Sequence, residues 1–76
     1  MSDKIYMVTV ASSTKMNIIN SSNGTVVASF SYNGELVTGP VSSGDKCTYV
    51  VRYPSNQKKG FIINLPQGTI NSTFSV

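Results

Sequence analysis

Hydrophobic and polar residues alternate along most of this sequence with a period of two, which is the pattern of β-strands whose two faces meet different surroundings. The clearest example is TVVASFSY, residues 25–32, in which Val26, Ala28, Phe30 and Tyr32 fall on one face. The other face carries mostly threonine and serine. No stretch has the 3.6-residue period of an amphipathic helix. The sequence therefore predicts an all-β protein.

Six further segments have the character of short strands. They are KIYMVTV (4–10), MNII (16–19), ELVT (35–38), CTYVVRY (47–53), FIINL (61–65) and TINSTFSV (69–76). KIYMVTV is apolar on both faces, which indicates a central or doubly covered strand. In the last segment Ile70, Phe74 and Val76 are predicted to share one face. We therefore expect about six to seven short strands.

Turn residues separate these segments at intervals of about 8–12 residues, as in an antiparallel β-sandwich or a small β-barrel. Asn33-Gly34 predicts a hairpin, because both residues adopt positive φ angles readily. The segments NSSNGT, SSGDK and LPQGT predict further hairpin turns. Pro40 is expected to break or redirect the chain, because it cannot donate to a strand ladder. The sequence predicts one compact β-domain over residues 1–76 without linker or tail, and sandwich and barrel stay open as alternatives.

A chain this small needs a source of folding stability in addition to its hydrophobic core. A domain of this length buries only about 60% of the surface that its unfolded chain exposes. The single cysteine, Cys47, cannot form an intramolecular disulfide, and a chain with three acidic residues and no histidine is a poor source of metal ligands. Association with other chains is the supplement that remains. We therefore expect a homo-oligomer or docking on a larger protein assembly, with no metal and no cofactor.

The residues that commonly carry catalysis do not form a recognisable set. Histidine, the commonest general base, is missing from the sequence. Cys47 lies on the predicted inner face of its strand, which indicates a small buried hydrophobic residue and not a nucleophile. Glu35 and Asp45 lie beside predicted turns, where a solvated carboxylate is the usual occupant, and no glycine-rich phosphate loop is present. We expect that the chain is not an enzyme.

The last predicted strand carries threonine, asparagine and serine but no charge, so it is poorly protected against pairing with another chain. Thr73 and Ser75 are the candidate residues for that contact. Serine, threonine and asparagine make up 26 of the 76 residues, whereas only 12% are charged against about 25% in an average domain. In length, composition and strand layout the chain resembles small structural proteins that coat or join larger assemblies. Accessory capsid, head or tail proteins of bacteriophages are examples, so the resemblance implies a non-enzymatic virion component.

Two other functions stay open. A carbohydrate- or host-protein-binding module would present an exposed aromatic ring, for which Tyr32 and Tyr53 are the candidates. A small barrel that binds single-stranded nucleic acid would use Lys58 and Lys59, which lie between aromatic residues in a chain of net charge +3. Six positive charges spread along the chain are few for a protein that depends on about 6–10 phosphate contacts. The lysine pair is therefore predicted to be a solubilising loop tip, and nucleic acid is the less favoured partner.

The first ten residues, MSDKIYMVTV, contain no long apolar segment of the kind found in secretory signals. No run approaches the roughly 20 apolar residues of a membrane span. We therefore expect synthesis in the cytoplasm without a signal peptide, incorporation into a virion, and no membrane partner.

Overall fold

The computed structural model describes residues 6–76, which form seven β-strands and no helix. The strands are β1 (Tyr6–Ser12), β2 (Lys15–Asn20), β3 (Thr25–Ser31), β4 (Glu35–Ser43), β5 (Lys46–Arg52), β6 (Lys58–Asn64) and β7 (Thr69–Ser75). Every pair of hydrogen-bonded neighbours is antiparallel. The predictions of an all-β fold and of six to seven short strands are confirmed.

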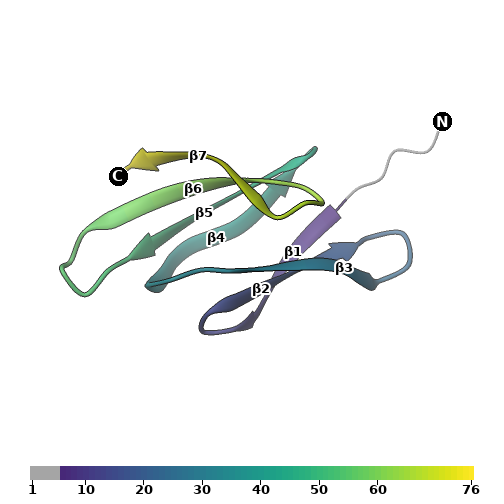
Figure 1. Ribbon diagram of the computed structural model, residues 1–76, viewed down its shortest axis with the longest axis horizontal. Helices are drawn as coiled ribbons and strands as arrows, with labels where there is room; N and C mark the ends of the chain where they lie inside the picture. The colour runs from purple at the N-terminus through teal and green to yellow at the C-terminus, as the bar shows by residue number, and fades with distance from the viewer. Residues whose placement is uncertain (1–5) are drawn as a thin grey trace.

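The strands form two sheets, in which each strand pairs only with its neighbours along the chain. One sheet has the order β1-β2-β3 and the other the order β4-β5-β6-β7. In Figure 1 the four-stranded sheet lies above the three-stranded one, with β7 at its far edge. The backbones of the two sheets come close together at β1 and β4. The result is a small sandwich-like fold whose outer edges include β3 and β7.

The core lies between the two sheets and is centred on β5. The side chains with essentially no exposed surface are Met16, Ile18, Cys47, Val51 and Ile63. Tyr49 lies at the centre of an aromatic cluster. Its ring stacks on the rings of Phe61 and Phe30, with distances between ring centroids of 5.3 Å and 6.0 Å. Tyr32 meets the same ring edge-on at 5.9 Å. The alternation of CTYVVRY therefore directs one face of β5 inward, as predicted.

Asn33-Gly34 does not form the predicted hairpin. β3 and β4 belong to different sheets, so this dipeptide lies in a crossing from one sheet to the other. Gly34 does take a positive φ of 92°. The crossing is held by Tyr32, whose backbone N–H donates to the carbonyl of Thr14 at 2.9 Å and whose hydroxyl donates to the carbonyl of Ser12 at 3.0 Å. Burial of the tyrosine thus directs the chain away from a hairpin.

Of two further expectations about strands, one is wrong and the other holds only in part. The segment KIYMVTV is not a central strand: β1 is an edge strand, and Met7 and Val10 are about half exposed. Residues 4 and 5 of that segment lie outside the described residues. Pro40 does not end its strand, because β4 continues to Ser43. The ladder with β5 is irregular around the proline, which an edge strand tolerates because one side of it needs no partner.

A β-bulge in β7 separates residues that were predicted to share a face. The register with β6 shifts so that Asn71 is the extra residue. Ile70 lies opposite Ile63, on the inner face, whereas Phe74 lies opposite Gly60, on the outer face. A bulge reverses the alternation that follows it, so the prediction of one shared apolar face in this strand is wrong.

Candidate interaction site: the β7 edge and the pocket at its end

β7 is the outermost strand of the four-stranded sheet and, among the described strands, pairs only with β6 (Figure 1). All seven of its residues are exposed, and none of them is charged or a proline. An edge strand presents unpaired N–H and C=O groups at regular spacing, and natural edges are usually protected by lysine, proline or a covering segment. Thr73 and Ser75 therefore lie on an unprotected edge.

The ring of Phe74 anchors this exposed strand to β6. The register places Phe74, Gly60 and Val50 in one row across the outer face of the sheet. A Cβ atom at Gly60 would lie only 2.0 Å from Cζ of Phe74, so the ring occupies the space that a side chain would need. Val50 is buried although it belongs to the outer face. Apolar contact across the glycine thus adds to the backbone ladder in holding β7.

β1 and β3 are also edge strands without a charged residue. They differ from β7 in that side chains of both are partly buried against the core, among them Val8, Ala28 and Phe30. β4, by contrast, carries Pro40 and lies beside β1. Among these edges β7 is the one whose residues are exposed throughout.

The loop between β5 and β6 positions the charged side chains near the end of β7. The N–H of Tyr53 donates to the carbonyl of Gln57 at 2.8 Å, and the N–H of Asn56 donates to the carbonyl of Tyr53 at 2.8 Å. Asn56 has a φ of 68°, in the left-handed region that asparagine occupies more readily than most residues. The closed loop returns the chain so that Arg52 and Lys58 lie opposite each other.

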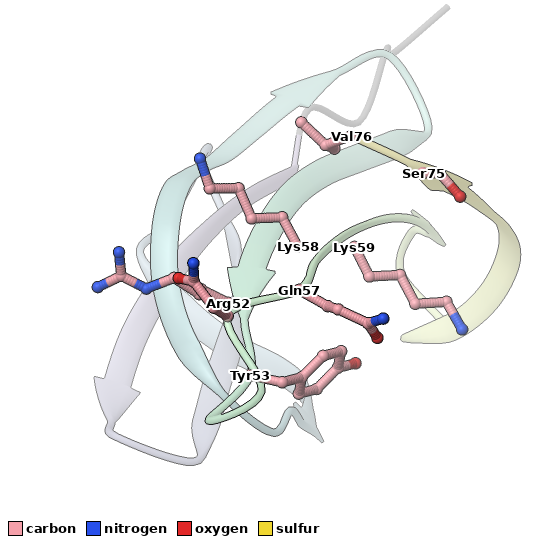
Figure 2. Close-up of a pocket in the computed structure, with 8 residues that line it drawn as sticks. Arg52, Tyr53, Gln57, Lys58, Lys59, Ser75 and Val76 are labelled. Carbon is pink, nitrogen blue, oxygen red and sulfur yellow. The ribbon is translucent and has the colours of Figure 1, made fainter.

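An open pocket of about 760 Å³ lies between this loop and the end of β7 (Figure 2). It is lined by Arg52, Tyr53, Asn56, Gln57, Lys58, Lys59, Ser75 and Val76. Four of the six residues proposed from the sequence as contacts for a partner therefore meet at one place: Tyr53, Lys58, Lys59 and Ser75. Thr73 lies on the same strand but does not line the pocket.

Two positive charges of this pocket are without a carboxylate partner among the described residues. Arg52 forms an ion pair with Glu35 on the adjacent strand. The Nζ atom of Lys59 lies 5.6 Å from the centroid of the Phe61 ring, and neither Lys58 nor Lys59 has an ion pair there. In Figure 2 the two lysine side chains point in opposite directions, as successive residues of a strand do. Each face of β6 therefore carries one available ammonium group.

The two candidate tyrosines have different environments. Tyr53 is half-buried and lines both the pocket and a second open hollow on its other side. Tyr32 is only 6% exposed and belongs to the core cluster. The expectation that Tyr32 presents an exposed aromatic ring is therefore wrong, because the crossing between the sheets inserts its ring into the core.

Four lining residues were not found from the sequence, namely Arg52, Asn56, Gln57 and Val76. The spacing of two cationic positions, Arg52 and Lys58, around a short polar loop was the available signal. The contact of Phe74 with Gly60 was also missed, since it depends on the register between the strands.

The described residues contain no group of three or more His, Cys, Asp or Glu side chains that could hold a metal ion, and within residues 6–76 no helix is long and apolar enough to cross a membrane. Burial raises the pKa of the Cys47 thiol to about 11. The same cause, with smaller contributions from Cys47, Tyr53 and Tyr32, raises the pKa of Tyr49 to about 12. Both groups are therefore neutral at physiological pH.

Comparison of the chain with models of known protein families, with curated proteins and with solved structures finds no match.

Proposed function

We propose that this chain is a non-enzymatic structural protein that associates with other protein chains through the edge of β7. In this proposal it is a small accessory component of a larger assembly, such as a bacteriophage virion. The observation that supports this function is an edge strand that is exposed at all seven residues and carries neither a charge nor a proline. An added strand would satisfy the unpaired backbone groups of such an edge.

In the pure protein, the same edge would pair with a second copy. Antiparallel pairing of β7 with β7 of another molecule is symmetric about a twofold axis, so each copy offers the surface that the other needs. The contact would also cover part of the apolar surface of Ile70 and Val76, which are 60% and 69% exposed. Association would thereby supply the stabilisation that a chain of 76 residues lacks.

The test is the solution mass of the protein by light scattering over a wide range of concentrations. We expect reversible self-association that is lost in Thr73→Glu and in Ser75→Glu, because each change places a charge on the edge at which the second strand would pair. Unfolding by urea should show that both variants remain folded, since both positions are exposed.

Ser29→Glu is the matched control, because it places the same charge on another uncharged edge strand, β3. It should leave self-association unchanged. A wild-type chain that stays monomeric at the highest concentration would contradict the proposal. So would association that survives both β7 variants, or that only Ser29→Glu abolishes.

Binding of single-stranded nucleic acid is a second candidate, favoured by the meeting of Tyr53, Lys58 and Lys59 in one pocket. Two observations weigh against it. The charge of Arg52 is balanced by Glu35. The ring of Phe61, which could otherwise stack on a base, lies beneath Lys59 on one side.

A further inference from the structure

We infer that the edge of β7 takes an extended segment of a different protein, and that this segment carries acidic residues at the end that lies beside Ser75. This inference rests on the proposed function, because it names the class of partner that the same edge would bind. The carboxylates of the segment would pair with Lys58 and Lys59.

The register brings Lys59 within reach of a strand added to β7, and Lys58 is the preceding residue of the same strand. Lys59 and Ser75 lie opposite each other, so their side chains share the inner face. A partner strand would lie two strand spacings, about 10 Å, from β6. The extended side chains of a lysine and an aspartate together span that distance, and the small side chain of Ser75 does not block the path.

Because the side chains of the two lysines point in opposite directions, we expect the partner segment to carry two consecutive acidic residues. Successive side chains of the added strand point to alternate faces. One carboxylate would therefore lie on the inner face toward Lys59, and the next on the outer face toward Lys58.

A second copy of this chain does not supply such carboxylates from its described residues. Of its acids there, Glu35 is paired with Arg52, and Asp45 is paired with Lys46 at 3.1 Å. Asp3 lies outside the described residues. Two copies, each of net charge +3, also repel each other. An acidic segment would form backbone hydrogen bonds with the edge of β7 and ion pairs with the two lysines. It should therefore displace a second copy of this chain from the edge.

A nucleic acid fits this surface less well than a peptide. Its phosphates would pair with the lysines, but it has no alternating N–H and C=O groups for the edge of β7. Its bases would also need an open aromatic ring, whereas Phe61 is stacked on Tyr49 on one side and Tyr53 is half-buried.

The experiment measures binding of a fluorescent, acetylated and amidated peptide to the full chain by anisotropy. The peptide has two aspartates followed by a short run of alternating threonine and valine, so that antiparallel pairing sets its acidic end beside Ser75. The matched control peptide has asparagines in place of the aspartates. We expect the aspartate peptide to bind more than about tenfold more tightly, to weaken with salt and to reduce self-association.

Three variants locate the contact. Lys58→Gln and Lys59→Gln should each weaken binding of the aspartate peptide about fivefold, as expected for an exposed ion pair. Lys15→Gln, which removes a positive charge from the other sheet, should leave its binding unchanged.

The outcomes separate this inference from the proposed function. Equal binding of both peptides, insensitive to the lysine variants but lost in Thr73→Glu, would overturn the acidic partner and retain the β7 edge. Failure of both peptides to bind, together with a monomeric wild-type chain, would overturn both. Tighter binding of a short single-stranded oligothymidylate, unaffected by Thr73→Glu, would assign the lysines to nucleic acid and overturn the inference.

Discussion

The ring of Phe74 lies over Gly60 in the space that any larger side chain would occupy. Glycine is a poor strand residue, and an aromatic ring laid across it from the neighbouring strand compensates for its missing side chain. Gly60 is not among the glycines with positive φ, so alanine suits the backbone there. The conflict at this position is therefore with the ring alone.

This contact predicts a strong coupling between the two residues. Gly60→Ala should destabilise the protein by about 1–3 kcal/mol, because the new methyl group displaces the ring of Phe74. In a Phe74→Ala background the same change should cost little or even stabilise, since alanine is favoured over glycine in a strand by about 0.5–1 kcal/mol. Urea unfolding of the four proteins gives the coupling. Equal effects in both backgrounds would mean that the ring does not hold β7.

Among the elements, β5 and β7 represent opposite degrees of burial. β5 pairs with a strand on each side, and its Cys47, Tyr49, Val50 and Val51 are all buried. β7 pairs on one side only, and all its residues are exposed. Local opening costs least where few buried contacts and exposed hydrogen bonds coincide. The element proposed for binding is thus also the one most easily detached.

Hydrogen exchange should order the strands accordingly. In the monomer at low concentration, we expect the paired amides of β7 to exchange faster than those of β5. Self-association, or addition of the aspartate peptide, should slow exchange in β7 and leave β5 unchanged. NMR detects both effects residue by residue. Amides of β7 that exchange as slowly as those of β5 in the monomer would show that this strand does not open independently.

At the scale of the whole molecule, the core includes two groups that ionise at alkaline pH. Burial raises the pKa of Cys47 from 9.0 to about 11 and that of Tyr49 from 10.0 to about 12. In the unfolded chain both groups ionise near their ordinary values. At a pH between the unfolded and the folded pKa of a group, the unfolded state has lost a proton that the folded state retains. The folded state therefore becomes less stable relative to the unfolded state as the pH rises through that range.

The free energy of unfolding should therefore be constant with respect to these two groups below about pH 8 and decrease above pH 9.0. Each group contributes a slope of up to about 1.4 kcal/mol per pH unit. Urea unfolding at a series of pH values measures the slope. Cys47→Ala should remove the part that begins near pH 9.0 and keep the part due to Tyr49, which begins near pH 10.0. An unchanged slope in this variant would contradict the assignment to Cys47.

Residues close together in the sequence determined the fold class and the positions of the strands. Alternation of polar and apolar side chains needs only the two-residue repeat of a strand, so it is visible without knowledge of the partners. It correctly assigned Cys47, Tyr49 and Val51 to the core. Turn residues such as Gly44 and Gly68 marked where strands end, because they adopt the positive φ that other residues resist.

The tertiary structure alone decided which strands pair and which edges stay open. Asn33-Gly34 permits a hairpin and a crossing equally well, and burial of Tyr32 against the first hairpin selected the crossing. The bulge at Asn71 likewise depends on how β7 fits against β6. These choices rest on contacts between distant residues, which a local pattern does not encode.

The candidate site shows the same division. Lys58, Lys59 and Ser75 were singled out from the sequence for separate reasons, as a charged loop tip and an uncharged final strand. Only the ladder between β6 and β7 sets Ser75 opposite Lys59 and makes them parts of one pocket. The sequence by itself thus determined the residue types that are available for binding. Their meeting was decided by the tertiary structure, because strand register converts positions 16 residues apart into neighbours.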